Sequence, residues 1–263
     1  MISCGSGTHS LVFRRGQGRA VKLFRKSMNS SPRARAEYDL ALTFAAHNLV
    51  RVLAVNVTES WLEMEFMDGG TLAELVQRQG KLSECCIARA AADILAGLAV
   101  LHEHGFLHSD LKPANVMRDS RSGSCKLIDW IGAEEEQLSV LQGKPVGTPL
   151  FLAPEVVRKL WHMEQSDTWA LGCTVLNLSS GRLPWADADT MGRTNEFMAM
   201  WKTGNGHAPP FDAGACSASM AAFVQLCFEP DPLKRKTARS LCSTSALYFE
   251  VIADVVYGFL KTN

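Results

Sequence analysis

One segment in the middle of this chain carries a carboxylate, a lysine and an amide within a few residues of one another, and it reads His108-Ser109-Asp110-Leu111-Lys112-Pro113-Ala114-Asn115. A short apolar stretch follows and ends in a further carboxylate, Lys126-Leu127-Ile128-Asp129. A carboxylate can orient an attacking hydroxyl, a carboxylate with an amide can hold Mg²⁺, and a lysine can offset charge on a moving phosphoryl group. The residues that supply these groups are Asp110, Lys112, Asn115 and Asp129.

Both stretches closely resemble the catalytic loop and the magnesium-binding strand of eukaryotic protein kinases, in the form carried by the serine/threonine-specific members. The resemblance implies an α+β, bilobal protein-kinase-like fold, with a small β-rich N-lobe and a larger, mainly helical C-lobe. It implies one kinase domain over the 263 residues. We expect the N-lobe at about 1–66, the hinge at about 65–70 and the C-lobe at about 71–263. Asn115 and Asp129 are the implied metal ligands.

Composition sets further bounds. Hydrophobic content of 47% and charged content of 21% are ordinary for a globular protein, and the formal net charge is +0. The chain therefore has no global basic field to attract nucleic acid or an acidic membrane, although a local basic patch stays possible. We expect neither partner.

The cysteines and the start of the chain favour a reducing compartment. Eight cysteines are present without a Cys-x-x-Cys pair or a metal-binding spacing, so free thiols are expected. The first residues lack a secretion signal, and Ile2 stands where myristoylation needs glycine. The most apolar stretch, Ile94 to Leu101, is too short to span a bilayer. The sequence therefore predicts a cytoplasmic protein.

The amino-terminal residues resemble the kinase glycine-rich loop, with Ser10 at the position of its third glycine. Glycines there let the backbone approach phosphate oxygens, but Gly-x-Gly is also common in ordinary turns. The resemblance implies that ATP is contacted by Gly5, Ser6, Gly7, Ser10 and Val12.

A strand-like stretch, residues 20–24, then places Ala20, Lys22 and Phe24 on one face. Lys22 is either a snorkelling edge residue or the lysine that contacts the α- and β-phosphates. Its position one hairpin after the glycine-rich segment favours the second interpretation, and the resemblance places Ala20 beside it in the nucleotide site. Ser30-Ser31-Pro32 predicts the start of a helix that carries Glu37, either a surface residue or the ion partner of Lys22. Glu37 stands ten residues before His47-Asn48-Leu49-Val50, which resembles a turn of the kinase family, and this register favours the ion partner.

Residues 61–66 alternate in the manner of a strand, and Asp68-Gly69-Gly70 then breaks the chain. The stretch alone fits any strand and turn. The resemblance implies that Met64 is the gatekeeper beside the adenine pocket and that backbone groups of Glu65 and Met67 bind the adenine edge.

The second half of the chain continues the resemblance in family order. Residues 147–155 resemble the end of an activation segment, which implies that Thr148 bridges Asp110 and Lys112. Asp167 is expected to bond backbone amides of the catalytic loop. Arg235 is expected to pair with the carboxylate of the Ala-Pro-Glu motif, Glu155. A last amphipathic helix is predicted from Leu247 to Leu260.

Activity is a separate question from fold. The resemblance implies an ATP-dependent serine/threonine kinase that uses Mg²⁺ (or Mn²⁺), and the alternative is a pseudokinase that binds nucleotide or partners. Three departures from the family pattern bear on the choice, at Ser10, Ser109 and Trp130-Ile131. None of them supplies a group that touches the moving phosphoryl, so we favour activity.

Residues 65–72 look most like kinases acting upstream in mitogen-activated cascades, whose protein substrate is another kinase. The oligomeric state is left open.

Overall fold

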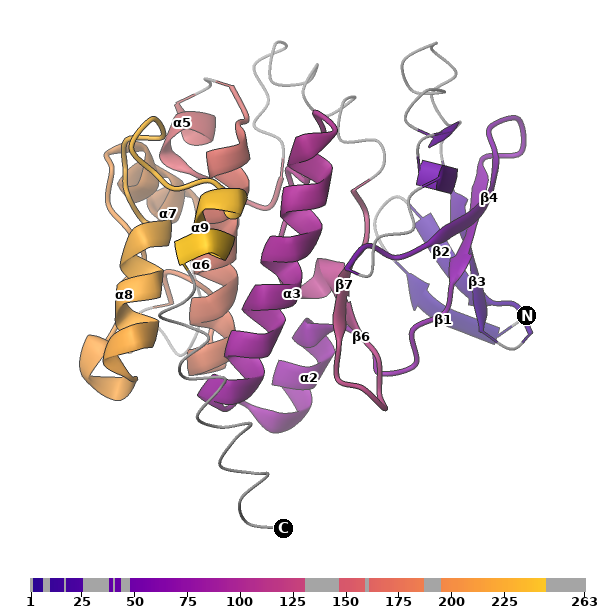
Figure 1. Ribbon diagram of the computed structural model, residues 1–263, viewed down its shortest axis with the longest axis horizontal. Coiled ribbons are helices and arrows are strands. Elements are labelled where there is room, and N and C mark those ends of the chain that lie inside the picture. Colours follow the sequence, from indigo (N-terminus) through magenta and orange to yellow (C-terminus); the bar gives the residue numbers. More distant parts are fainter. Residues whose placement is uncertain are drawn as a thin grey trace.

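The computed structural model describes residues 2–6, 10–16, 18–25, 38–39, 41–43, 48–130, 147–158, 161–186 and 195–244. Glu37, the predicted ion partner of Lys22, lies outside these ranges, as do Gly7, Ile131 and the predicted helix 247–260. Figure 1 shows a sheet on one side of the molecule, helices on the other, and a small hairpin between them. The predicted bilobal fold is confirmed.

The N-terminal sheet has five antiparallel strands in the order β1-β2-β3-β5-β4. Gly16 and Gly18, both at positive φ, form part of the turn between β2 and β3. In the sheet register Lys22 stands between Val12 and Leu62, so these three side chains share one face. The strands are β1 (Ile2–Ser6), β2 (Ser10–Arg14), β3 (Arg19–Phe24), β4 (Val52–Asn56) and β5 (Trp61–Glu65).

The remainder of the described chain is mainly helical. Its α-helices are α2 (Leu72–Gln79), α3 (Glu84–Glu103), α5 (Pro154–Val157), α6 (Glu164–Ser180), α7 (Glu196–Gly204), α8 (Ala218–Cys227) and α9 (Ala238–Thr244). Short 3₁₀ turns are η1 (Pro113–Asn115), η2 (Pro149–Phe151) and η4 (Ala213–Ala215). A two-stranded hairpin pairs β6 (Val116–Arg118) with β7 (Cys125–Leu127).

Local sequence explains where α2 and α3 begin. Thr71 and Glu74 form a capping box at the start of α2. The Ser83 hydroxyl accepts a hydrogen bond from the amide of Cys86 at 3.4 Å and so caps the start of α3, as serine commonly does before the first turn of a helix. Gly105, at φ 77°, follows the end of that helix, so the chain turns there toward the catalytic loop.

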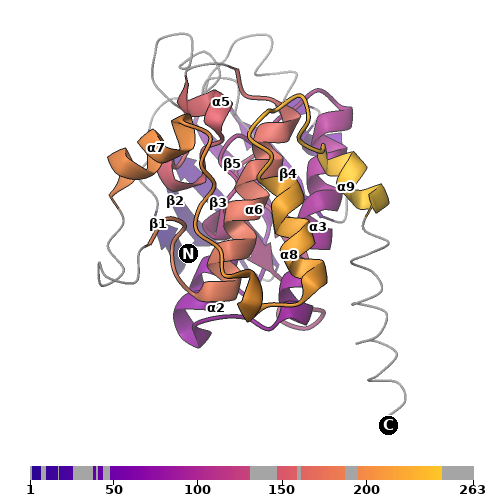
Figure 2. The ribbon, with the colours of Figure 1, turned by 90° about the vertical axis from the view of Figure 1, so that its left-hand side faces the viewer.

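The core of the C-lobe forms around α6, which is buried for most of its length. Figure 1 shows α6 between α3 and α8, Figure 2 shows the three helices side by side from another direction, and residues of both neighbours pack against α6. A Cβ on Gly172 would lie 2.8 Å from that of Cys227, so glycine permits this close approach of α6 and α8. The seven cysteines from Cys85 onward are free thiols, as predicted.

The structure corrects one expectation about α3. The apolar stretch from Ile94 to Leu101 was expected to be too short to span a bilayer, but the helix that contains it runs over 20 residues and is, by length and composition, long and apolar enough to cross a membrane. Alanines and cysteines near its start extend the apolar character. Core helices meet the same criterion, and Ile94, Leu98 and Leu101 are at most 1% exposed inside this fold.

Candidate active site

Four predicted side chains meet at the catalytic loop, between α3 and the β6–β7 hairpin. The Lys112 ammonium donates hydrogen bonds of 2.6 Å to Asp110 Oδ2 and to the Thr148 hydroxyl. That hydroxyl in turn donates to Asp110 Oδ1 at 2.7 Å. The Asn115 amide nitrogen donates to the backbone carbonyl of Asp110 at 2.8 Å and to Oδ2 at 3.0 Å. The Asp110 carboxylate is therefore held by three neighbouring groups.

The backbone of this loop takes a specific form. The short 3₁₀ turn η1 begins at Pro113. Proline suits the first position of such a turn because the amide it lacks would have no partner there. The turn brings Asn115 back toward Asp110, which explains how two residues five apart share hydrogen bonds.

A buried carboxylate supports the loop from below. Asp167 accepts hydrogen bonds from the backbone amides of His108 and Ser109, both at 2.9 Å, and contacts His102 Nε2 at 2.8 Å. Burial acts to raise the pKa of Asp167, but these hydrogen bonds and the neighbouring histidines outweigh it and hold the pKa below its ordinary value. The predicted contact of Asp167 with loop amides is confirmed. Ser109 adopts φ 62°, uncommon for a residue with a side chain.

The second predicted cluster joins the sheet to the end of β7. Lys22 Nζ lies 2.5 Å from Asp129 Oδ1, and the lysine side chain is 12% exposed. The strand β7 ends at Leu127, so Asp129 is not on the strand as expected but two residues beyond it, at φ 60°. Aspartate tolerates this left-handed conformation better than most residues. Lys22 therefore has an anionic partner in the site, which disfavours its interpretation as a snorkelling edge residue.

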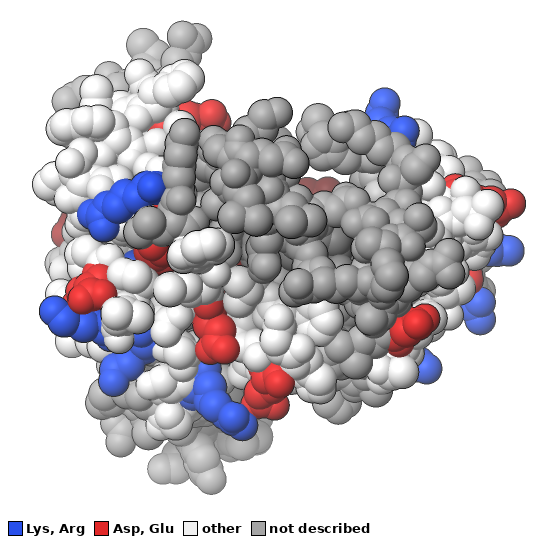
Figure 3. Space-filling view, turned by 90° about the horizontal axis from the view of Figure 1, so that it is seen from above, with Lys and Arg blue, Asp and Glu red and all other residues white. Residues whose placement is uncertain are grey.

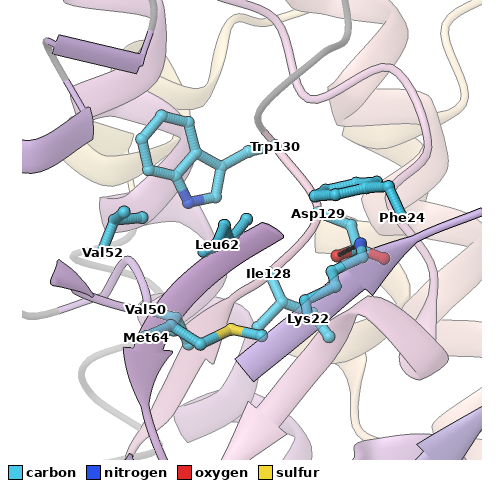
Figure 4. A pocket seen from close by; sticks show the side chains of 9 residues that line it. All are labelled: Lys22, Phe24, Val50, Val52, Leu62, Met64, Ile128, Asp129 and Trp130. Carbon is cyan, nitrogen blue, oxygen red and sulfur yellow. Dashed lines mark hydrogen bonds and ion pairs between the residues drawn. The ribbon is translucent and has the colours of Figure 1, made fainter. Parts of the chain in front are cut away.

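An apolar pocket adjoins the Lys22–Asp129 pair. Figure 4 shows this ion pair at one end of the pocket, with the Trp130 indole across from it. Met64, the predicted gatekeeper, contributes its side chain to the lining. The residues that line the pocket are Lys22, Phe24, Val50, Val52, Leu62, Met64, Ile128, Asp129 and Trp130.

The hinge follows β5 directly. Met67 is 7% exposed, and its backbone groups make no hydrogen bond with the described residues. The Glu65 carboxylate is occupied by its neighbours, because Oε1 accepts from Lys126 Nζ at 2.6 Å and from the Arg51 amide at 2.8 Å. A free backbone at Met67 fits a ligand edge with donors and acceptors.

The glycine-rich segment is only partly described. Gly5 and Ser6 form the end of β1, and Ser10 and Val12 lie on β2. Ser10 is 8% exposed. Ala20 pairs with Met64 in the sheet register, so these two lie on the same face as Lys22. The connecting residues 7–9 lie outside the described ranges.

The side-chain oxygens of Asn115 and Asp129 suit a cation whose remaining ligands come from phosphate groups. Among the described residues, no group of three His, Cys, Asp or Glu side chains could hold a metal ion alone. Asn115 uses its amide nitrogen as a donor to Asp110, and no described residue donates to its amide oxygen. An amide oxygen and the Asp129 carboxylate are hard ligands that fit Mg²⁺ where a nucleotide supplies further oxygens. Bound there, the cation would neutralise phosphate charge.

A buried ion pair fixes the end of the activation segment. The Arg235 guanidinium donates to both oxygens of Glu155, at 2.7 and 3.0 Å, and both side chains are at most 2% exposed. Ser166 donates to Glu155 as well, at 2.7 Å. The predicted pair is confirmed, and its bidentate geometry and third partner explain how two charges persist in the core.

Lys126 contacts Glu65 at the hinge, and no motif in the sequence predicts this contact. The alternation of β7 sends Lys126 to the opposite face from Leu127, and that face borders Glu65.

Figure 3 shows acidic and basic side chains interspersed over the described part of the upper face. A mixed surface of this kind agrees with the zero net charge.

Comparisons with known proteins agree with this geometry. The family model described as "Protein kinase domain" matches residues 3–247. A probable serine/threonine-protein kinase of Dictyostelium discoideum is 30% identical over 258 residues, which cover 92% of this chain and 39% of that relative. Mitogen-activated protein kinase kinase kinase 4 of Mus musculus is 37% identical over 205 residues, covering 74% of this chain and 12% of that one.

Among solved structures, the crystal structure of Rad53 1-466 in complex with AMP-PNP is similar with a TM-score of 0.71 and 25% identity. The match covers 92% of this chain and 62% of that chain. This chain spans less than half the length of the two curated relatives above. The family match over residues 3–247 and these relatives show that the chain belongs to the protein kinase family, among serine/threonine-protein kinases.

Proposed function

We propose that this domain transfers the γ-phosphoryl group of ATP to serine or threonine hydroxyls of proteins. The observation that carries the proposal is the cluster in which Lys112, Thr148 and Asn115 together hold the Asp110 carboxylate. A carboxylate held in this way can orient an incoming hydroxyl and accept its proton.

The other groups have complementary roles in this proposal. Lys22 contacts the α- and β-phosphates, and Lys112 offsets charge on the group in transit. Asn115 and Asp129 hold Mg²⁺ (or Mn²⁺) against the phosphates. The apolar pocket beside Met64 and the free backbone of Met67 receive the adenine.

We further propose a cytoplasmic protein whose substrate is itself a protein kinase. The support is that relatives bear the name mitogen-activated protein kinase kinase kinase, in Mus musculus and Homo sapiens among others. A panel of inactive kinases offered as substrates would test this, with a generic protein substrate of matched concentration as the reference. Faster labelling of the generic substrate than of any kinase would contradict it.

The test of activity is the transfer of label from radioactive ATP to a protein substrate by the wild type and by Asp110→Asn. We expect the variant to lose roughly 10²- to 10⁴-fold in kcat, the range for removal of a positioned general base. It should still bind a fluorescent ADP analogue, which shows that the fold is intact. Label on serine and threonine but not tyrosine is expected in the product.

The alternative, a pseudokinase, predicts a different result in the same experiment. Both proteins would bind the nucleotide analogue, and neither would transfer label. Three departures from the family pattern, at Ser10, Ser109 and Trp130-Ile131, are the reason to keep this outcome in view.

A further inference from the structure

An acidic side chain on α3, outside the catalytic cluster, makes contacts with two other segments. Asp93 Oδ1 accepts a hydrogen bond of 2.9 Å from the side-chain amide of Asn48, which precedes β4. Its other oxygen, Oδ2, accepts one of 2.7 Å from the backbone amide of Cys125, the first residue of β7. The Asn48 amide also donates to the Cys125 carbonyl at 3.3 Å. One carboxylate therefore joins a helix of the C-lobe, the segment before β4, and β7.

The backbone continues this connection in the same place. The Asn48 carbonyl accepts from the Leu127 amide, and the Val50 amide donates to the Leu127 carbonyl, both at 2.9 Å. Residues 48–50 thus run alongside β7 in a parallel pairing. β4, which they lead into, belongs to the sheet that carries Lys22.

Glycine on α3 makes the close packing possible. A Cβ on Gly97 would lie 2.8 Å from the Asn48 carbonyl oxygen and 2.9 Å from Leu127 Cδ1. Neither contact is sterically acceptable, so any larger residue at this position would push the helix away from the other two segments. Gly97 stands four residues after Asp93, on the same face of α3.

We propose that Asp93 is a positioning residue for the metal-binding side of the active site. It fixes the first residue of β7 against both the helix α3 and the segment that leads into β4. Asp129 lies two residues beyond β7, so a shift of β7 would move its carboxylate relative to Lys22. Displacements of about 1 Å at such groups are enough to cost on the order of a hundredfold in rate. The inference rests on the proposed function, in which Asp129 is a ligand of Mg²⁺.

The variant Asp93→Asn tests this with little change in shape. Its amide oxygen can still accept one hydrogen bond, but its nitrogen then faces either the Asn48 amide or the Cys125 N–H, and donors repel donors. Glu84→Gln is the matched control. Glu84 is on the same helix and likewise accepts from a backbone amide, that of Ser217 at 2.7 Å, but that contact lies in the C-lobe at the start of α8.

The measurement is the affinity for a fluorescent ADP analogue with Mg²⁺ and with chelator, beside the thermal midpoint of each protein. We expect Mg²⁺ to strengthen binding by the wild type and by Glu84→Gln to the same degree. In Asp93→Asn the gain from Mg²⁺ should fall roughly tenfold, the equivalent of one hydrogen bond to a charged group, while binding in chelator stays as in the wild type. The thermal midpoints alone would not separate the two variants.

Two results would overturn the proposal. A wild-type gain from Mg²⁺ that persists in Asp93→Asn would make Asp93 a purely structural residue and leave the proposed function untouched. No gain from Mg²⁺ in the wild type itself would contradict both. If Asp93→Asn does not fold, Asn48→Ser removes one donor to the same carboxylate, and the same loss of the Mg²⁺ gain is expected and decides the matter.

Discussion

The hydroxyl of Thr148 donates a 2.7 Å hydrogen bond to Asp110, a residue 38 positions earlier in the chain. This bond links the catalytic loop to the end of the activation segment, which the Glu155–Arg235 pair holds in the core. The geometry of Asp110 therefore depends on a segment outside the catalytic loop.

Replacing Thr148 with alanine should slow catalysis more than it weakens nucleotide binding. The change removes one donor to Asp110 and one acceptor from Lys112, and a hydrogen bond to a charged group contributes about 1.5–3 kcal/mol. We expect kcat to fall roughly ten- to a hundredfold, with the KM for ATP almost unchanged. Steady-state kinetics would measure both. Thr148→Ser keeps the hydroxyl and should recover most of the rate; a serine variant as slow as the alanine variant would show that the hydroxyl is not what matters.

Because Ser109 stands in the catalytic loop, we predict that the rate of catalysis does not depend on phosphorylation of the activation segment. The family places an arginine there, which binds a phosphorylated residue through charge-assisted bonds. Ser109 is 7% exposed, and its hydroxyl has no hydrogen-bond partner among the described residues. A serine cannot neutralise a phosphate, so phosphatase treatment should leave the rate within a few-fold. A large loss that is restored by phosphorylation of Ser139, which lies outside the described residues, would contradict this.

We predict that the large side chain of Trp130 is compensated by the small side chain of Ala41 in the core. The family usually has a smaller aromatic residue at the first position and a larger apolar residue at the second. Trp130 is 2% and Ala41 0% exposed, and both belong to one core cluster. Ala41→Leu should therefore overpack the core and lower the free energy of unfolding by about 1–3 kcal/mol. Denaturant unfolding measures this, with exposed Leu42→Ala as the control; an Ala41→Leu protein as stable as the wild type would refute the exchange.

The buried carboxylate of Asp167 predicts how stability depends on pH. Its pKa in the folded protein is lowered, so the unfolded chain binds the proton more readily. The contribution of Asp167 to stability is therefore complete above the ordinary carboxyl pKa of about 4 and is lost as the pH falls toward the folded-state pKa. We expect Asp167→Asn to be less stable at neutral pH and to show a flatter acid limb in its unfolding free energy. An acid limb as steep as that of the wild type would assign the pH dependence to other groups.

Substrate selection should show little preference for arginine before the target residue. Kinases with that preference often carry acids before the catalytic-loop asparagine and after the hinge glycines, and here Ala114 and Thr71 stand there. Two acids lie near Thr71, and both already accept hydrogen bonds. Glu74 accepts from the Thr71 amide at 2.9 Å, and Asp68 accepts from the amide of Ser120 at 3.1 Å, where hydrogen bonding from Ser120 lowers its pKa. A positional peptide library should select arginine by less than roughly tenfold, or about 1.4 kcal/mol. Stronger selection, abolished in Asp68→Ala, would show that this carboxylate remains available.

Features set by short-range sequence were predictable. The Ser83 cap and the Gly105 turn follow from residue types at defined offsets. The Glu155–Arg235 pair was predictable only because the family resemblance supplies a contact between residues 80 apart. Where no motif supplied the contact, prediction failed, as for Lys126 with Glu65 and for Asp93 with Asn48. Such contacts depend on how helix and strands pack, which periodicity alone does not specify.

The positive φ values of Ser109 and Asp129 lower the stability of the fold at two residues of the proposed active site. Neither is glycine, and each holds a conformation that costs on the order of 1 kcal/mol or more. Glycine or asparagine would relieve that cost, so a laboratory search for heat-resistant variants that ignores turnover should enrich replacements at these two positions. Serine tolerates this conformation less well than aspartate, so we expect replacements of Ser109 before replacements of Asp129. A replacement of Asp129 by glycine would raise thermal stability and at the same time remove the proposed metal ligand.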